Sequence, residues 1–256
     1  MSLDSMSFFE VLGFLDVFGY SDHLINGIIT TMGLYAFALF FGLALGLVLA
    51  IVRHYGGPIS SRIAAAYVEF FRGTPLIAQL FAIWFGKSYF NDFLVLIGLP
   101  EINFRWKIIL FQISPSQDIF ISAQVLVAAI TLGLNSAAYQ AVFFRGSIKS
   151  IGGGQMTAAR AIGMTKAQGI RYVVLPQSLR RVIPAWSNEA AYLPKYTTAA
   201  YLIGIEEIFA KVKIITQATF SVFEVYLLCA VFFLILISII TQIMDRIYEK
   251  YKIPGL

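Results

Sequence analysis

Charged residues are scarce in this 256-residue chain, making up only 13% of it, compared with roughly 25% in an average soluble domain. Hydrophobic residues make up 59%, and the mean hydropathy is +0.78. A soluble domain does not need uncharged apolar stretches of about 20 residues repeated along its length. The composition therefore excludes an ordinary soluble fold and predicts a multi-pass integral membrane protein.

Three further absences weigh against an enzyme. Cys229 is the only cysteine and lies in an apolar run, which excludes a disulfide framework and a thiolate metal site. The only histidines, His23 and His54, fall on opposite sides of the predicted membrane and cannot share a site. The chain also has no Gly-x-x-x-x-Gly-Lys-Ser/Thr phosphate loop, so we do not expect it to hydrolyse ATP. We assign it no catalytic residue, no metal ligand and no cofactor of its own.

Five hydrophobic segments are long enough to cross a bilayer. They are residues 25–52, 63–86, 119–144, 182–205 and 222–243. The first and third contain no charged residue, and the fifth contains only Glu224. The second carries Glu69, Arg72 and a Gly73-Thr74-Pro75 sequence, and the fourth carries Asn188, Glu189 and Lys195. We therefore expect an all-α membrane domain over residues 25–244 with five transmembrane helices.

The basic residues indicate the orientation of these helices, because short loops rich in Lys and Arg stay in the cytoplasm. The loop after the third segment has no acid and seven bases: Arg145, Lys149, Arg160, Lys166, Arg171, Arg180 and Arg181. Residues 1–24 are acidic, and Phe8, Leu12, Leu15 and Phe18 recur at near-helical spacing, as in a helix on the membrane surface. We expect residues 1–24 outside and the tail, residues 245–256, in the cytoplasm.

The outer stretch of residues 87–118 contains Pro100 and Pro115 and two apolar stretches too short to span a bilayer. Two interpretations remain open. The stretch is either a re-entrant or surface excursion, or a docking surface for an external partner.

The basic cytoplasmic loop contains a predicted short helix. Helix formers fill residues 155–162 after a glycine-rich breaker, Gly163 is a C-terminal stop, and Pro176 ends the following segment. Small residues at Ala158, Ala159 and Ala161, with Arg160 for an ion pair, suit a groove on a soluble partner. A basic loop held on anionic lipid is an equally open interpretation.

This loop resembles the cytoplasmic signature of the permease subunits of binding-protein-dependent ABC importers: Glu-Ala-Ala, three residues, Gly, nine residues, Ile, one residue, Leu-Pro. Ala158, Ala159, Gly163, Leu175 and Pro176 match, Val173 stands for Ile, and Thr157 stands for Glu. The chain also resembles the polar amino acid branch of this family. Residues from Tyr67 to Leu76 are similar to the branch's second-span motif, and Ala138-Tyr139 with Arg145-Gly146 is similar to the end of its third span. Val142 replaces a usual Glu there, and Gln177, Pro184, Asn188, Lys195, Thr197 and Thr198 continue the likeness.

The resemblance implies a multi-pass subunit of the cell (plasma or inner) membrane that forms the path for a polar amino acid. It implies a second permease subunit, identical or similar, an extracellular solute-binding protein, and cytoplasmic ATPase subunits that use ATP and Mg. Contact with the ATPase is then expected at Gln155, Thr157, Ala158, Ala159, Arg160, Gly163, Leu175 and Pro176. The resemblance further implies that a coupling helix here moves with the ATPase and switches the cavity between its outward-open and inward-open states.

Polar residues inside the spans are candidates for the substrate path, because an unpaired charge is costly in lipid. They are Glu69, Arg72, Thr74, Asn188, Lys195, Thr197 and Thr198. Glu69 and Arg72 are alternatively an ion pair on one helix face, and Asn188 a bond between helices. Lys195 and the hydroxyls after it suit the carboxylate of an amino acid.

Two other functions compete with this one. An ion-gradient-driven secondary transporter predicts inverted repeats, and we find none in the sequence. A scaffold needs no charge in its spans, and Arg72 and Lys195 argue against that role.

Overall fold

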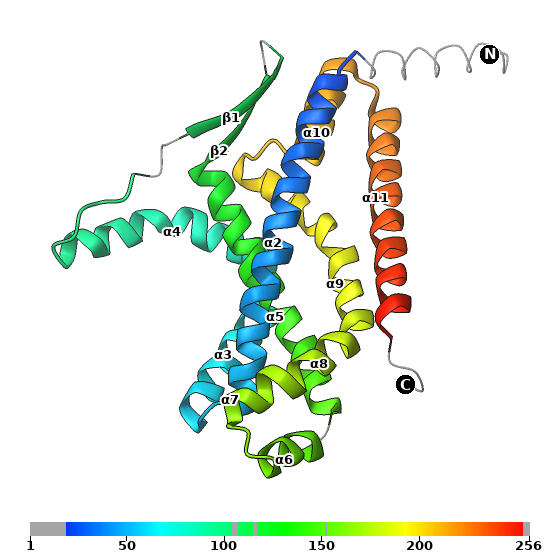
Figure 1. The fold of residues 1–256 in the computed structure, drawn as a ribbon. Helices are drawn as coiled ribbons and strands as arrows, with labels where there is room; N and C mark the ends of the chain where they lie inside the picture. Colours follow the sequence, from blue (N-terminus) through cyan, green and yellow to red (C-terminus); the bar gives the residue numbers. More distant parts are fainter. Residues whose placement is uncertain (1–18, 104–106, 115–116, 152, 253–256) are drawn as a thin grey trace. The chain divides into compact units, whose positions relative to one another are not determined.

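The computed structural model describes residues 19–103, 107–114, 117–151 and 153–252 (Figure 1). In chain order the elements are α2 Ser21–Tyr55, α3 Pro58–Gly73, α4 Leu76–Leu96, β1 Lys107–Ser114, β2 Gln117–Ser122, α5 Ala123–Ser150, α6 Gly153–Ala161, α7 Lys166–Gly169, a π-helix η1 Ile170–Val174, α8 Leu175–Arg181, α9 Ile183–Tyr196, a 3-10 helix η2 Thr197–Ile203, α10 Ile208–Thr219 and α11 Val222–Tyr251. Most of the predicted surface helix within residues 1–24 lies outside the described residues.

Within the described residues, three helices are long and apolar enough to cross a membrane: α2, α5 and α11. They correspond to the first, third and fifth segments predicted from the sequence, except that the third begins at Ala123, because residues 119–122 belong to β2. At their C-terminal ends the helices run beyond the apolar residues, α2 into Arg53-His54-Tyr55 and α5 to Ser150. Arg and Lys are good helix formers, so a helix does not have to stop where hydrophobicity stops.

The second predicted span is not one helix. It divides into α3 and α4 at Thr74, whose φ of −113° and ψ of 146° are extended. Thr74 precedes Pro75, and the proline ring disfavours a helical conformation in the residue before it. α4 then continues past the expected end at Gly86 to Leu96.

The fourth predicted span is also interrupted. α9 ends at Tyr196, the 3-10 helix η2 follows, and Gly204 closes it with a φ of 84°. Pro194 stands inside α9. Proline removes a backbone donor and crowds the preceding turn. Within the described chain, neither interrupted segment provides a helix with the length and hydropathy of α2, α5 and α11.

The prediction of a purely α-helical chain is wrong in the stretch after α4. β1 and β2 pair antiparallel, from Lys107 opposite Ser122 to Ser114 opposite Gln117, with two register shifts between these ends. Both sequences are rich in isoleucine and phenylalanine, which favour strands. Of the two apolar stretches that are too short to span a membrane, the second, residues 108–113, is therefore part of strand β1.

The chain forms two compact units. The first unit comprises Met1–Phe37, Leu76–Leu132 and Pro194–Leu236, and the second unit comprises Ala38–Pro75, Gly133–Leu193 and Ile237–Leu256. Four of the five boundaries fall inside α2, α5, α9 and α11, and the fifth lies between Pro75 and Leu76, where α4 begins.

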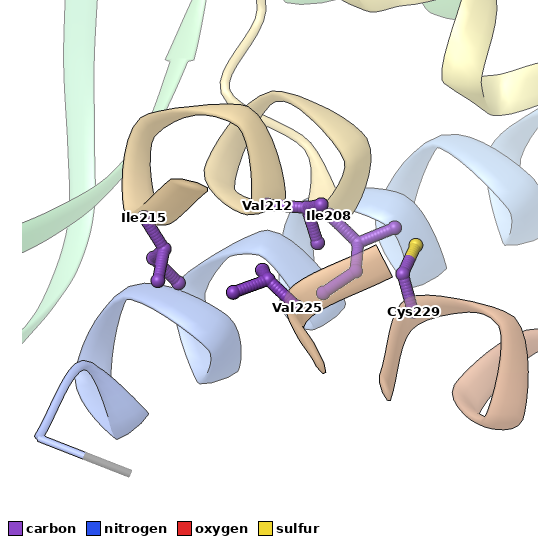
Figure 2. Packing of buried hydrophobic residues seen from close by; sticks show 5 residues of the cluster. All are labelled: Ile208, Val212, Ile215, Val225 and Cys229. Atoms are coloured by element: carbon purple, nitrogen blue, oxygen red, sulfur yellow. The ribbon is translucent and has the colours of Figure 1, made fainter. Parts of the chain in front are cut away.

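The core of the first unit joins α10 to α11 (Figure 2). The side chains of α10 that face α11 are Ile208, Val212 and Ile215, and those of α11 are Val225 and Cys229. Tyr20, just before α2, and Leu24 and Ile28 of α2 pack against this cluster. A Cβ at Gly27 would lie 2.9 Å from the Cα of Ile208, so the absence of a side chain allows α2 to approach α10 closely.

The N-terminus of α10 is capped by buried side chains. The carboxylate of Glu207, which is 0% exposed, accepts from the N–H groups of Phe209 and Ala210 at 3.0 and 2.9 Å. The N–H of Ile208 donates to Thr31 Oγ1 at 3.1 Å. Burial raises the pKa of Glu207 from 4.5 to about 7, although the two backbone N–H groups act in the opposite direction.

The core of the second unit joins α2, α5 and the segment around η1 and α8. Its buried members are Ala50, Phe144, Ile148, Val174 and Val182. Met156 of α6 and Trp186 of α9 also pack against this cluster. The loop that the sequence predicts to be cytoplasmic is therefore part of the second unit, and its residues contribute to this core.

Candidate functional site

The predicted loop helix is present as α6, and it ends where the sequence indicates. The N–H of Gly163 donates to Arg160 O at 3.0 Å and that of Met164 to Ala159 O at 3.1 Å. Gly163 has a φ of 87°, a left-handed conformation that glycine adopts without the strain a side chain brings. Gly163 is therefore required by the backbone of the turn.

A capping box starts the next helix, α7. The Thr165 hydroxyl accepts from the Gln168 N–H at 3.3 Å, and the Gln168 side chain accepts from the Thr165 N–H at 2.8 Å. Sequence reasoning missed this feature, although a Thr followed by Gln three residues later is a known sign of a helix start.

The prediction that Pro176 ends the segment before it is wrong, because α7, η1 and α8 follow one another without a break from Lys166 to Arg181. Leu175 donates its N–H to Ile170 O, a π-type bond five residues back. The wider π turn ends just before Pro176, which stands in the first turn of α8. Proline is tolerated there because a first-turn N–H has no partner within the helix.

α6 packs on this second stretch through one face. Ala159 is 3% exposed, and a Cβ at Gly169 would lie 2.8 Å from Met156 Sδ. Gln177 donates to Gln155 Oε1 at 3.4 Å, and Thr157 donates to Gly153 O at 3.1 Å. The packing holds α6 against the rest of the loop.

The opposite face of α6 is exposed and has small or apolar side chains. Ala158 and Ala161 are exposed, and Ile162 just after the helix is 74% exposed. Arg160 is also exposed. A small-residue surface with a large apolar residue at its edge is suited to contact with another protein.

Hydrogen bonds tie the loop to the helices of the second unit. Arg181 Nη1 donates to Ser150 O at 2.7 Å, and Ser147 Oγ, at the end of α5, donates to Ser178 O at 2.6 Å. Lys166 Nζ donates to Tyr55 O, the last residue of α2, at 2.5 Å. The loop is thus fixed to both α2 and α5.

A buried polar network crosses the second unit, and sequence reasoning missed most of it. Ser136 Oγ donates to the Glu189 carboxylate at 2.6 Å. Gln140 Nε2 donates to Leu39 O at 3.1 Å and to Ser136 Oγ at 3.0 Å, and Gln140 Oε1 accepts from Trp186 Nε1 at 2.7 Å. The network connects α2, α5 and α9.

Four of the seven path candidates lie in the second unit: Glu69, Arg72, Thr74 and Asn188. Glu69 accepts from Arg53 at 3.0 Å, so the ion pair that forms joins α3 to the end of α2 instead of joining Glu69 to Arg72. The Arg72 guanidinium lies 5.3 Å from the centre of the Tyr139 ring. Thr74 Oγ1 donates to Phe70 O at 2.8 Å, and Asn188 is exposed.

The other three candidates, Lys195, Thr197 and Thr198, lie in the first unit around Pro194. Thr197 donates to Pro194 O at 2.7 Å, and Thr198 donates to Lys195 O at 2.6 Å. Both hydroxyls therefore bond to backbone carbonyls where α9 passes into η2. The Lys195 side chain is exposed.

Residues 42–252 match the family described as binding-protein-dependent transport system inner membrane component. The chain is 32% identical over 228 residues to a probable amino-acid permease protein, YxeN, of Bacillus subtilis, covering 89% of this chain and 90% of that protein. It is 30% identical over 231 residues to the glutamine transport system permease protein GlnP of Escherichia coli, covering 90% and 93%. A solved amino acid ABC transporter with histidines shares the fold with a TM-score of 0.71 at 26% identity, over 93% of this chain and 98% of that one.

Proposed function

We propose that this chain, which belongs to the binding-protein-dependent transport system inner membrane components, is the permease subunit of an ATP-driven amino acid importer. Its relatives include a probable amino-acid permease and a glutamine permease, each matched over most of its length. The likeness to a solved amino acid transporter supports the same solute class. The chain is a transport component of the membrane, and ATP hydrolysis belongs to a partner.

The proposed topology has five transmembrane segments, with the N-terminus outside and the C-terminal tail in the cytoplasm. α2, α5 and α11 provide three of them. The segments α3–α4 and α9–η2 provide the other two as broken helices. Broken backbone is tolerated at membrane depth only where it faces protein or a water-filled cavity, so these two segments are suited to line a path.

The proposed path for the amino acid includes Glu69, Arg72, Thr74, Asn188, Lys195, Thr197 and Thr198. Because an amino acid carries a carboxylate, an exposed cation such as Lys195 is suited to attract it. The Thr198 hydroxyl already donates to a carbonyl, so its oxygen remains as an acceptor for the solute's ammonium group. Thr197 is 0% exposed, so its proposed role is to support the backbone where α9 passes into η2.

The proposed coupling element lies in the loop from Gln155 to Pro176, and α6 at the start of this loop carries the contact face. This proposal is supported by the burial of α6, which packs Ala159 against its own chain and leaves Ala158, Ala161 and Ile162 exposed. An ATPase subunit that binds ATP and Mg would contact this face. Bonds from Lys166 and Arg181 to the ends of α2 and α5 would transmit its movement. The other proposed partners are a second permease subunit and an extracellular solute-binding protein.

A pair of alanine-to-arginine variants tests the coupling proposal. Ala158→Arg places a large charged side chain on the exposed face of α6, whereas Ala167→Arg places it on an exposed position of α7 in the same loop. We expect an ATPase subunit to co-purify from native membranes with the wild type and with Ala167→Arg, and to be lost from Ala158→Arg. Gly163→Arg is a poorer test, because its positive φ adds backbone strain to any effect on docking.

Amino acid uptake in cells expressing these variants completes the test. Uptake should follow the ATPase, and should persist when an ionophore collapses the ion gradients while ATP is maintained. A chain that purifies without any ATPase, and whose uptake stops with the ionophore, would show an ion-gradient-driven secondary transporter instead.

A further inference from the structure

Three positive side chains of the second unit gather where α2, α5 and α7 end or begin. Arg145 and Lys149 lie in the last two turns of α5, and Lys166 begins α7. Lys166 Nζ donates to Tyr55 O and lies 5.7 Å from the centre of the Tyr55 ring, which brings α7 to the end of α2. Tyr55 packs in one cluster with Phe144 and Ile148, the neighbours of Arg145 and Lys149, so the ends of α2 and α5 and the start of α7 meet.

The pKa of His54, on the last turn of α2, responds to all three charges. Burial lowers this pKa, and the positive charges of Arg145, Lys149 and Lys166 lower it further. Because water and salt screen charges at longer range, this response agrees with the three cations lying near the end of α2.

These cations are not neutralised within the described part of the chain. The ion pairs there are Arg53–Glu69, Lys211–Glu206 and Lys252–Glu249, and none includes Arg145, Lys149 or Lys166. Arg145 Nε is buried and has no hydrogen-bond partner among the described residues. Like charges held together repel one another, so an anion bound between them would be stabilised.

The cluster stands at the end of the apolar part of two membrane-spanning helices. The uncharged run of α2 stops at Val52 and that of α5 at Phe144, one residue before Arg145. Tyr55 adds an aromatic ring of the kind that lies at the membrane interface. Phospholipid phosphates lie at this depth, and basic pockets between membrane helices bind anionic headgroups.

We propose that Arg145, Lys149 and Lys166 bind the phosphate of one anionic phospholipid at the cytoplasmic ends of α2 and α5. Arg53 does not take part, because Glu69 already neutralises it. Arg160 on α6 and Arg180 on α8 are exposed positive charges of the same loop, and neither is among the charges that lower the pKa of His54. The bound lipid would hold α5, α7 and α2 together at their ends, a role separate from solute transport and ATPase binding.

A charge-matched pair of variants tests the proposal. Lys149→Gln removes one charge of the cluster, and Arg180→Gln removes one charge of the loop outside it; both side chains are exposed, so folding is not at risk. The purified full-length chain in each form is placed in nanodiscs of phosphatidylcholine with a minor share of phosphatidylglycerol of the same acyl chains. Native mass spectrometry then counts the lipids retained on the released protein.

We expect the wild type and Arg180→Gln to retain one phosphatidylglycerol in preference to phosphatidylcholine. Lys149→Gln should hold it about five-fold more weakly, the effect of one cationic charge at a membrane surface. Lys149→Arg should restore retention, and higher salt should weaken it.

Three results would overturn the proposal. Equal weakening in Lys149→Gln and Arg180→Gln would indicate general attraction to a basic surface. Equal retention of the two lipids would show that headgroup charge does not matter. Displacement of the phosphatidylglycerol by millimolar inorganic phosphate would identify a site for a free anion.

Discussion

Gly46 stands where α2 packs on α5 in the second unit, and replacing it with alanine tests that packing directly. A Cβ at this position would lie 2.9 Å from Ala137 O, 2.9 Å from Gln140 Cβ and 3.1 Å from Ala141 N. Carbon atoms in good contact are about 3.5–4.0 Å apart. Two of the three neighbours are backbone atoms that cannot rotate away, so the two helices must separate by several tenths of an ångström.

The free-energy change for Gly46→Ala combines opposing contributions. Overpacking of a well-packed core costs about 1–3 kcal/mol, and stretching the bond from Gln140 Nε2 to Leu39 O, now 3.1 Å, loses part of about 1 kcal/mol. Alanine is more favourable than glycine inside a helix by about 1 kcal/mol. The unfavourable effects win, and we expect the free energy of unfolding to fall by about 1–3 kcal/mol.

Gly33→Ala is the matched control, since it adds the same methyl group to the same helix. A Cβ at Gly33 meets nothing within 4 Å, so only the gain in helix preference of about 1 kcal/mol remains. Thermal unfolding followed by circular dichroism in detergent should give a lower Tm for Gly46→Ala and an equal or higher Tm for Gly33→Ala. At about 2–4 °C per kcal/mol, the two variants should differ by at least about 4 °C. The packing argument is refuted if both substitutions raise the Tm.

Three further predictions concern buried polar groups and a helix cap. Because burial raises the pKa of Glu207 to about 7, the folded chain holds a proton there that the unfolded chain has released between pH 4.5 and 7. As the pH rises through this window, the Tm of the wild type should therefore fall more steeply than the Tm of Glu207→Gln. Parallel curves of Tm against pH would contradict this. Trp186→Phe leaves Gln140 Oε1 without its donor and should cost about 1–3 kcal/mol in thermal unfolding, whereas no change would mean that another donor replaces it. Thr165→Ala removes the capping box with Gln168 and should cost about 1 kcal/mol, with Thr165→Ser as the control that keeps it.

The long helices could be predicted from the sequence because a charge-free apolar run leaves few alternatives in a membrane protein. Residues 25–52, 123–144 and 222–243 lie in long helices, whereas residues 119–122, predicted to start the third span, belong to β2. The breaks in the other two segments depend on the proline at position 75 and on the 3-10 turn after Pro194. Hydropathy averages over such features, so the geometry of a break is not visible in it.

The partners of the polar residues could not be predicted in the same way. Ser136 and Gln140 are four residues apart in α5, a spacing that places both side chains on one face of the helix. Their partners Glu189, Trp186 and Leu39 lie on other helices, 46 to 101 positions away, and only the packing of the helices brings them together.

The loop helix shows the opposite case, because its limits are set locally. Gly163 ends α6 through its own backbone conformation, and that tendency is present in the sequence. The ion pair of Glu69 depends instead on the tight turn between α2 and α3, which brings Arg53 closer in space than sequence distance suggests. Local sequence signals were therefore sufficient to predict where α6 ends, but insufficient to predict the ion-pair partner of Glu69 in α3.

Cys229, the single cysteine, is buried between α11 and α10 in the core of the first unit. The folded wild-type chain therefore offers a thiol reagent almost nothing to react with. A cysteine introduced at an exposed position, such as Tyr89 at 79% or Ile162 at 74% exposure, would be the one site that takes up a spectroscopic label without any prior removal of Cys229. Labelling of Cys229 itself would then mark the moment when α10 and α11 come apart.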